Sequence, residues 1–324
     1  MQRKSNVTMN ELIASKMVQL KSNNQINTSN NYRSLLHFIE RNFGVVRASE
    51  CDSAFVQRMN AAMSHLSNSS KAVYFACFKS VWFFAQYKGY TGKAEFPFRR
   101  NAYETDKVKI PKMARRTEHW MTREDMSTLF NYWRGMKNGL RKRYVGLFLA
   151  SYLMNGCNVA DLVRMRYNND WFVSNGRILT FVRHKTAEKS PVTVRVPVIP
   201  QLKEILDCIA DQPYRNGLVF GSFTEGILPG EDALLKRIMA LNNGVTKILR
   251  KELPKAGLRG DVSVTYARHS YSTVLNHLCA PFAMIERALG HVGDGVAFNY
   301  IGSFSDDMLY EWNSKLIITE KAPC

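Results

Sequence analysis

The sequence lacks long apolar runs and clustered cysteines, and each absence excludes a class of protein. No apolar stretch approaches the roughly 20 residues that a membrane-spanning helix needs. Residues 1–6 include basic side chains, but no apolar stretch follows them, so they do not predict a signal peptide. The six cysteines are scattered, without a C-x-x-C pair or an obvious pairing with histidine, which predicts free thiols and no zinc site. We therefore expect a cytosolic protein that carries no metal and no other cofactor.

Acidic residues are also few, with 27 Asp and Glu against 45 Lys and Arg, a net charge of +18 and a sequence pI near 9.7. A charge this positive indicates a polyanionic partner, of which DNA or RNA is the usual one. The charge alone also fits a basic protein that binds acidic partners or membrane surfaces. At 324 residues and 45% hydrophobic content, the chain is long enough for two domains with their own cores.

The first hundred residues predict a small helical bundle. Polar capping residues and apolar spacing predict helices over 8–20 and 28–41, and a third helix that begins at Asp52. After a polar break at 67–70, the segment 73–84 is apolar nearly all round. Such a segment is typical of the central helix of a bundle.

A basic stretch follows, with seven basic and two acidic residues between positions 99 and 116. Pro97 and Pro111 frame much of it, which disfavours a continuous helix. A charge run is often only a solvated face, but between two folded domains it fits a linker lying along a phosphate backbone. We expect domains over 1–105 and 119–324, joined by a linker over 106–118. The predicted DNA-binding residues of the stretch are Arg99, Arg100, Lys107, Lys109, Lys112, Arg115 and Arg116.

The second domain is predicted to be mainly α with a small antiparallel sheet, an α+β class. Thr122 and Asp125 resemble a capping box ahead of a helix to about 133, and a longer helix follows over 143–154. The chain is mostly helical again from 201 onward.

The sheet is predicted from two signals. The apolar runs 171–173 and 178–182 flank Asn175-Gly176, a dipeptide typical of a tight hairpin turn. Residues 192–198 alternate valine with threonine, arginine or proline, which predicts a third strand.

The C-terminal part places Arg268, His291 and Tyr300 within 33 consecutive residues. An arginine fork matches phosphate oxygens, a histidine adds a second donor, and a tyrosine can act as the nucleophile of a covalent intermediate. Together these side chains can hold a phosphodiester and attack it without a metal.

Their order and spacing resemble the C-terminal signature of the tyrosine recombinases, which include phage and transposon integrases, chromosome-dimer resolvases and DNA invertases. The pattern R-H-[ST] is followed by L-G-H, 21 residues after the arginine, and by a tyrosine nine residues after the histidine. Each element alone is common, whereas the order and spacing together are specific. Within the family, the chain resembles the branch found on conjugative transposons and in phase-variation invertases of gut anaerobes.

The resemblance implies a site-specific recombinase, an enzyme that cleaves and rejoins DNA without metal or ATP. Tyr300 would attack the scissile phosphate and form a 3′-phosphotyrosyl bond. Arg268 would hold the non-bridging oxygens, and His291 would donate a hydrogen bond to the same phosphate. Lys185 matches the family lysine that protonates the leaving 5′-oxygen, and His269 would be structural.

Two positions depart from the family pattern. Asn158 stands where the family has its first catalytic arginine, and Thr265 stands where the H-x-x-R box has its first histidine. Losing a positive charge in a desolvated phosphate site costs about 2–4 kcal/mol of transition-state stabilisation unless another cation replaces it. Threonine can donate to phosphate, but it is no general acid or base near neutral pH. The candidate replacement cations are Arg141, Arg143, Arg164 and Arg166, of which the first two are also predicted to bind DNA.

The resemblance also implies partners. The N-terminal helices would be a core-binding domain that clamps double-stranded DNA together with the catalytic domain. A last helix, capped by Ser305 and apolar from Met308 to Ile317, docks on its own domain or is traded between protomers of a homo-tetramer on two DNA sites. A monomer without DNA, accessory DNA-bending proteins and a place in the bacterial nucleoid also fit this resemblance.

Three other functions compete with an active recombinase. Asn158 and Thr265 favour a recombinase fold that has lost catalysis and serves as a DNA-binding or accessory factor. A type IB topoisomerase shares the chemistry, but the chain lacks the added bulk of such enzymes. A metal-dependent nuclease or polymerase is disfavoured because no Asp/Glu/His cluster has ligand spacing. The glycines of 290–295 lack the preceding strand and the spacing of a nucleotide-binding loop.

Overall fold

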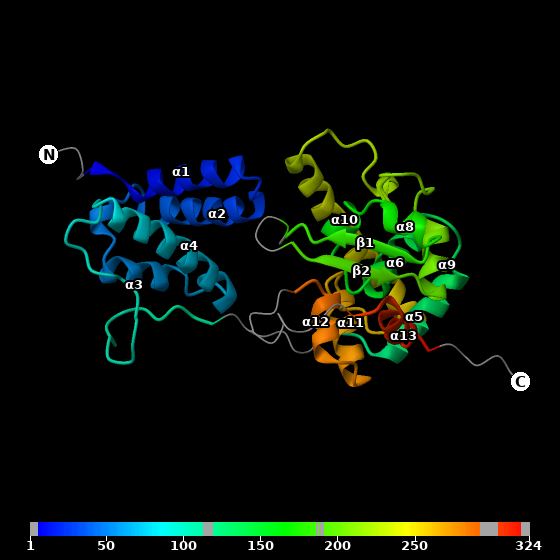
Figure 1. Ribbon diagram of the computed structural model, residues 1–324. Coiled ribbons are helices and arrows are strands. Elements are labelled where there is room, and N and C mark those ends of the chain that lie inside the picture. The colour runs from blue at the N-terminus through cyan, green and yellow to red at the C-terminus, as the bar shows by residue number, and fades with distance from the viewer. Residues whose placement is uncertain (1–5, 113–118, 186, 188–190, 292–303, 319–324) are drawn as a thin grey trace, which may run out of the picture. The chain divides into compact units, whose positions relative to one another are not determined.

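The computed structural model divides the chain into two compact units, Met1–Arg116 and Thr117–Cys324 (Figure 1). It describes residues 6–112, 119–185, 187, 191–291 and 304–318. The described residues are mainly helical, with one two-stranded antiparallel sheet. The predicted class, mainly α with a small antiparallel sheet, is confirmed.

The described part of the first unit is built from helices α1 (Met9–Ser22), α2 (Ile26–Phe43), α3 (Ser53–Ala62) and α4 (Asn68–Tyr87). Thr8, Asp52 and Ser67 cap α1, α3 and α4, each accepting a hydrogen bond from a backbone N–H three residues on. The helix α2 begins at Ile26, two residues before its predicted start, and the Ser29 hydroxyl donates to the Met17 carbonyl at 3.1 Å instead of capping the helix.

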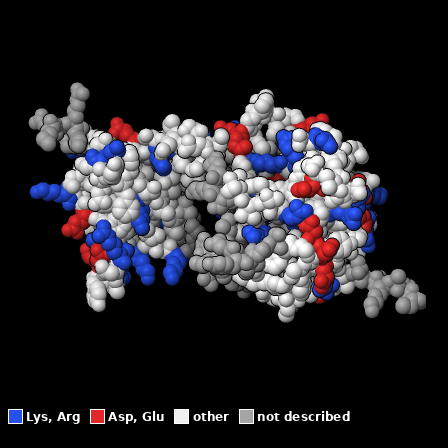
Figure 2. Space-filling view, viewed as in Figure 1, with Lys and Arg blue, Asp and Glu red and all other residues white. Residues whose placement is uncertain are grey.

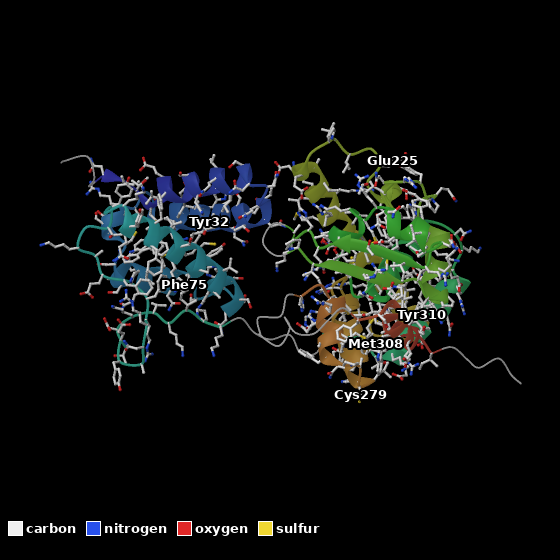
Figure 3. The ribbon with its side chains drawn as sticks, in the orientation of Figure 1. Tyr32, Phe75, Glu225, Cys279, Met308 and Tyr310 are labelled. Atoms are coloured by element: carbon white, nitrogen blue, oxygen red, sulfur yellow. The ribbon has the colours of Figure 1, made fainter. Side chains whose placement is uncertain are left out.

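Aromatic side chains of α4 fill the centre of this unit. Phe75 and Trp82 are fully buried, and the Trp82 indole nitrogen donates to the Cys51 carbonyl at 2.9 Å. Figure 3 shows Tyr32 of α2 and Phe75 among the same helices. The chain after α4 returns to this core. Val108 forms an isolated β-bridge with Phe98, and its side chain packs against the buried residues of the first unit.

The described part of the second unit surrounds α6 (Leu140–Leu153), which is buried along residues 145–153. This helix packs against α5 (Arg123–Gly135), α9 (Pro200–Ile209), α10 (Glu231–Glu252) and α11 (Tyr266–His277). The shorter elements are α7 (Val159–Leu162), α8 (Asn169–Val173), β1 (Ile178–Val182), β2 (Thr193–Pro197), α12 (Phe282–Ala288) and α13 (Asp306–Ser314).

The predicted hairpin around Asn175-Gly176 is wrong. The run 171–173 lies in α8, and Asn175 and Gly176, with φ of 53° and 77°, form the turn from α8 into β1. The strand β1 pairs instead with β2, with Ile178 opposite Pro197. The left-handed dipeptide was therefore correctly placed at a turn, but it ends a helix.

Side chains of α8 explain why this apolar run is helical. Asp170 accepts a hydrogen bond from the Thr180 hydroxyl at 2.6 Å, which anchors the helix on β1. Trp171 lies over Gly176, where a Cβ atom would come 3.2 Å from the indole ring. Both contacts need a compact turn over the start of β1, and an extended strand would not provide them.

The last helix, α13, docks on its own unit. Arg195 of β2 holds the Asp306 carboxylate with two hydrogen bonds of 2.7 Å. Asn313 is fully buried and donates to Asn155 Oδ1 at 2.8 Å, while the Tyr271 hydroxyl donates to Asn313 Oδ1 at 3.1 Å. A buried polar network therefore joins α13 to α11 and to the loop after α6.

Candidate functional site

Arg268 ties together two loops that are distant in sequence. It lies in the first turn of α11, where Nη1 donates to the Gly156 carbonyl at 3.1 Å and Nη2 to the Leu289 carbonyl at 2.8 Å. Gly156 has a φ of 62°, and a Cβ atom there would come within 3.0 Å of Arg268 Cα. The absence of a side chain at this left-handed position thus lets the loop after α6 reach the arginine.

His291 lies between a carboxylate and a guanidinium. Its Nδ1 is 2.9 Å from Glu286 Oε2, and its Nε2 is 2.9 Å from Nη2 of Arg268. Glu286 belongs to α12, and Gly290, with a φ of 66°, turns the chain so that the histidine comes back over that helix. The predicted pair of Arg268 and His291 is therefore in direct contact.

A second guanidinium, that of Arg183, lies in the same site. This residue follows β1, is 6% exposed, and donates from Nη1 to the Gly290 carbonyl at 3.2 Å. Burial, and then the nearby charge of Arg183, lower the pKa of Arg268 to about 10. The arginine remains cationic at neutral pH in spite of both effects.

Two carboxylates balance part of this positive charge. Asp161 is buried and accepts a hydrogen bond from the His184 backbone N–H at 2.9 Å, while Glu286 is held by His291. Between them, burial and the charge of Asp161 raise the pKa of the Cys157 thiol well above its usual value. Cys157 is therefore a neutral, inert thiol beside the two arginines.

The two departures from the family pattern are placed at helix starts. Thr265 precedes α11, is exposed, and has its hydroxyl 2.9 Å from that of Ser263. Asn158 precedes α7 and is half-buried, and its side chain makes no capping hydrogen bond. Neither side chain forms a hydrogen bond with Arg268 or His291 in the described part of the chain.

The two other predicted catalytic residues are Lys185, which the structure describes, and Tyr300, which it does not. Lys185 is exposed in the turn after β1, two residues beyond Arg183. Tyr300 lies outside the described residues, as do Arg115 and Arg116 of the basic stretch.

The four arginines proposed as replacement cations are all engaged elsewhere. Arg141 pairs with Glu252 at 3.6 Å, and Arg143 donates to the Ser222 hydroxyl at 2.7 Å. Arg164 pairs with Glu231 and Arg166 donates to the Asn216 carbonyl.

Sequence reasoning missed Arg183 and Glu286. The first follows a predicted strand, where an arginine is normally expected to face solvent. The second lies five residues before His291, a spacing that brings two side chains together only because Gly290 reverses the chain. One signal for Arg183 was available in the sequence. It is a basic residue that directly follows a predicted strand and lies two positions before Lys185.

The first unit carries much of the positive charge. Residues 1–116 contain 19 Lys and Arg against 7 Asp and Glu, which is +12 of the total +18. On the face drawn in Figure 2, Lys and Arg side chains gather along the segment that follows α4.

Within that segment the predicted DNA-binding residues differ in how exposed their side chains are and in the contacts that these side chains make. Lys109 and Lys112 are exposed, and Arg100 lies over the Phe96 ring, 4.5 Å from its centroid. Lys107 has only 13% of its side chain exposed and pairs with Glu104 at 3.1 Å. The side chain of Arg99 donates to the backbone carbonyls of 101 and 102.

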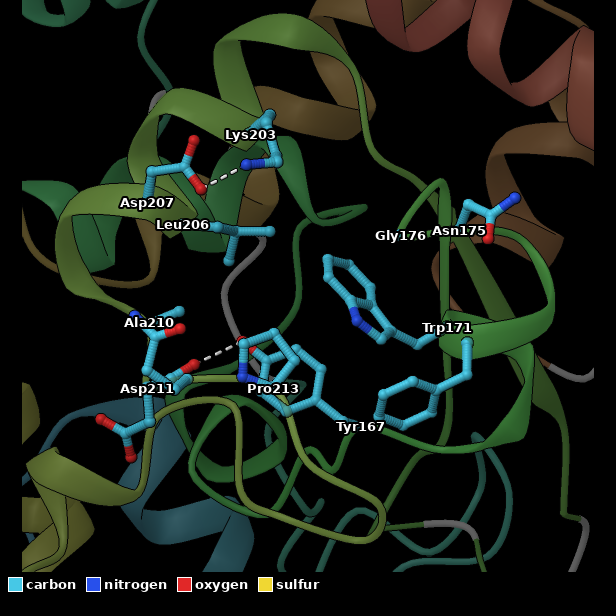
Figure 4. Close-up of a pocket in the computed structure, with 12 residues that line it drawn as sticks. Tyr167, Trp171, Asn175, Gly176, Lys203, Leu206, Asp207, Ala210, Asp211 and Pro213 are labelled. Carbon is cyan, nitrogen blue, oxygen red and sulfur yellow. Dashed lines mark hydrogen bonds and ion pairs between the residues drawn. The ribbon is translucent and has the colours of Figure 1, made fainter.

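A separate pocket of about 460 Å³ lies beside α8 and α9 (Figure 4). Its charged lining includes two carboxylates, Asp207 and Asp211, and one ammonium group, that of Lys203, which pairs with Asp207. A lining with more negative than positive charge disfavours phosphate. The candidate site is therefore the Arg268 cluster and not this pocket.

Two searches of the described residues bear on other kinds of site. No group of three or more His, Cys, Asp or Glu side chains in that part of the chain could hold a metal ion. Among the helices of the described segments, none combines the length and apolar character needed to cross a membrane.

Known proteins match this chain in structure, and the family models and curated sequences do not match it. No protein-family model matches the chain, and no curated protein matches it. A crystal structure of a lambda integrase (75–356) dimer bound to a COC′ core site is similar, with a TM-score of 0.59 and 15% identity, over 89% of this chain and 96% of that one. The Tn1549 transposon integrase in complex with circular intermediate DNA is similar, with a TM-score of 0.55 and 14% identity, over 93% and 97%. A lambda integrase tetramer bound to a Holliday junction matches with a TM-score of 0.57 and 15% identity, over 91% of this chain and 80% of that one. The resemblance expected from the C-terminal motif is thus confirmed at the level of the fold, and the chain has the fold of the tyrosine recombinases.

Proposed function

We propose that the protein is a site-specific DNA recombinase, an integrase or invertase that cleaves and rejoins double-stranded DNA. The observation that carries the proposal is the 2.9 Å contact between Arg268 and His291 in a chain with this fold. These two side chains are the phosphate-binding pair that the sequence motif predicts. Further support comes from the net charge of +18, which suits a polyanionic substrate.

In the proposed reaction, the Tyr300 hydroxyl gives its proton to water and its oxygen attacks the scissile phosphorus. The bond to the 5′-oxygen breaks, and that oxygen takes a proton from Lys185. Arg268 and His291 stabilise the charge that develops on the non-bridging oxygens. The phosphate ester bond is conserved in the 3′-phosphotyrosyl adduct, so a 5′-hydroxyl can reverse the step without ATP or metal.

The proposal assigns a role to each part of the chain. Residues 1–105 form a core-binding domain, 106–118 a basic linker, and 119–324 the catalytic domain, which together clamp the duplex. Exchange of strands between two DNA sites requires several protomers, and we expect a homo-tetramer assembled on DNA through α13. Accessory DNA-bending proteins and a nucleoid-associated cytoplasmic location belong to the same proposal.

A second function is favoured by specific residues. Asn158 carries no charge where the family has an arginine, and Thr265 cannot act as a general acid or base near neutral pH. A chain with the recombinase fold and both changes could bind DNA as an accessory factor without cleaving it.

Covalent trapping separates the two functions. Wild type, Tyr300→Phe and the exposed-surface control Tyr310→Phe are incubated, without metal or ATP, with nicked suicide duplexes tiled across the DNA that flanks the gene. A denaturation-resistant protein–DNA adduct with wild type and Tyr310→Phe, absent with Tyr300→Phe, supports the recombinase. Tight binding of a duplex by all three proteins without any adduct favours the accessory factor.

A further inference from the structure

Arg183 is a buried cation that makes no ion pair in the described part of the chain. The residue is 6% exposed, and its Nε has no hydrogen-bond partner among the described residues. Its one hydrogen bond there is from Nη1 to the Gly290 carbonyl, at 3.2 Å. A buried guanidinium without a carboxylate is unfavourable unless an anion binds to it.

The guanidinium groups of Arg183 and Arg268 are neighbours. They donate to consecutive carbonyls of one loop, Arg268 to Leu289 at 2.8 Å and Arg183 to Gly290 at 3.2 Å. The next residue of that loop is His291, whose ring contacts Arg268. Two guanidinium groups and one imidazole ring therefore converge where one loop follows α12.

Neither carboxylate near this site forms an ion pair with Arg183 in the described part of the chain. Asp161 accepts a hydrogen bond from the His184 backbone N–H, and Glu286 contacts the ring of His291. Two guanidinium groups at such close range repel each other, and a shared phosphate converts that repulsion into attraction.

Gly290 makes room for the Arg183 side chain. A Cβ atom at this position would collide with Arg183 Cδ and would come within 2.8 Å of Val194 Cγ2. The glycine before His291 therefore has a second role besides its φ of 66°: it lets the stem of Arg183 pass underneath the loop.

In the described part of the chain, the four arginines considered as replacements for the charge that Asn158 lacks all make other contacts. Arg164 and Arg166, the nearest in sequence to Asn158, contact Glu231 and the Asn216 carbonyl. Arg141 and Arg143 contact Glu252 and the Ser222 hydroxyl. Among the described arginines, Arg183 is the one that shares a loop with Arg268.

We propose that Arg183 supplies the second positive charge of the phosphate site, binding a non-bridging oxygen of the scissile phosphodiester in place of the family's first arginine. This inference rests on the proposed function and deepens it. Arg268 and Arg183 then hold the phosphoryl group from two sides, and Asn158 need not contact it. Arg183 is in this view a catalytic residue, because it touches the reacting group.

The first test compares the same variants on a charged and on an uncharged scissile phosphate, beginning with the natural, charged one. Wild type, Arg183→Gln, Arg183→Lys and Arg177→Gln are compared in adduct formation on a suicide duplex. Arg177 lies at the other end of β1, is exposed and donates to the Ser174 carbonyl, so its variant is the matched control. On the natural phosphodiester, Arg183→Gln is expected to lose about 100- to 1000-fold in rate, Arg183→Lys less, and Arg177→Gln nothing.

The same proteins are then given a duplex with a methylphosphonate at the scissile position, which carries no charge there. If Arg183 neutralises that charge, the loss in Arg183→Gln shrinks to less than about 10-fold on at least one stereoisomer, since the partner of the arginine is gone. An equal loss on both substrates would mean that Arg183 only supports the fold, and no loss on either would overturn the proposal outright.

A second readout does not depend on cleavage. Inorganic phosphate, compared with potassium chloride at equal ionic strength, is expected to raise the Tm of wild type and Arg177→Gln but not that of Arg183→Gln. An equal rise in all three proteins contradicts the inference. If wild type forms no adduct but the phosphate effect still depends on Arg183, the proposed function fails while the anion site stands.

Discussion

Nε2 of His291 lies 2.9 Å from Nη2 of Arg268, and Nδ1 of the same ring lies 2.9 Å from Glu286 Oε2. A guanidinium can only donate hydrogen bonds, so we assign the lone pair of the imidazole to Nε2 and its proton to Nδ1. In this arrangement the histidine has no proton to offer a phosphate. It must leave Arg268 and take up a second proton before it can donate, and the imidazolium would then face the Glu286 carboxylate.

Glu286→Gln should therefore slow adduct formation without weakening DNA binding. The amide oxygen can still accept from Nδ1, but it cannot stabilise an imidazolium. A hydrogen bond to a charged group is worth about 1.5–3 kcal/mol, so the rate should fall about 10- to 100-fold. Single-turnover trapping on a suicide duplex measures the rate, with Glu311→Gln, a surface residue paired with Lys315, as control. An unchanged rate in Glu286→Gln would remove the carboxylate from the mechanism.

Gly290→Ala should destabilise the second unit by more than the usual penalty for a left-handed alanine. Its Cβ atom meets Arg183 and Val194, whereas Gly257, with a φ of 76°, has open space around the same position. Gly257→Ala thus measures the backbone penalty alone, about 1–2 kcal/mol, and overpacking adds about 1–3 kcal/mol at Gly290. By scanning calorimetry of the full chain, Tm should fall at least about 2 °C further in Gly290→Ala. Equal losses in the two variants would argue against close packing of Arg183 under the loop.

The docking of α13 should weaken in acid. Hydrogen bonds from Arg195 hold the pKa of Asp306 below its usual value. A depressed carboxylate pKa stabilises the folded state above the unfolded pKa near 4, and this contribution is lost as the pH falls through the folded value. The partly exposed, bidentate pair should contribute about 1 kcal/mol at neutral pH.

Hydrogen exchange of the α13 amides tests this sign. At pH 7, Asp306→Asn should exchange about fivefold faster than wild type, and the ratio should approach one as the pH falls below about 4. Comparing the proteins at the same pH cancels the intrinsic exchange chemistry. Asp307→Asn, an exposed neighbour in the same helical turn, controls for the helix dipole. A ratio that stays constant as the pH falls further below that value would assign the effect to something other than the ion pair.

The exposed lysines of the basic stretch should contribute to DNA affinity through counterion release, and the paired ones should not. Lys109→Gln should reduce the slope of log K against log salt by about one. Lys107→Gln should change it little, because this side chain is mostly buried and already paired with Glu104. Fluorescence anisotropy with a random-sequence duplex over a range of potassium chloride concentrations measures both slopes. Equal slopes for the two variants would contradict DNA contact at Lys109.

Local signals in the sequence predicted most of the secondary structure. Capping residues such as Thr8, Asp52 and Thr122 lie where the structure begins a helix, because a side-chain oxygen satisfies backbone donors wherever that helix is. The apolar run 171–173 was misread as a strand because its helical turn depends on Asp170 and Trp171 packing on β1. Such tertiary contacts leave no periodic pattern in so short a run.

Only those residues of the site that belong to the sequence motif could be predicted. The motif singled out Arg268 and His291 as residues of one phosphate site, and the structure places their side chains 2.9 Å apart. The place of Arg183 could not be read in the same way, since its burial depends on a glycine more than a hundred residues later in the chain. Residues held by a loop from another part of the fold need coordinates to be found.

The polar network beneath α13 gives the last helix a way to act on Arg268. Asn313 bonds to Asn155, which adjoins the glycine whose carbonyl holds Arg268, and to Tyr271, which lies one turn further along the same helix as that arginine. Removing α13 strips two buried polar groups of their partner, and the arginine loop then loses part of its support. Coupling between two sites is reciprocal, so an anion that binds Arg268 should also stabilise the docking of α13 on its unit.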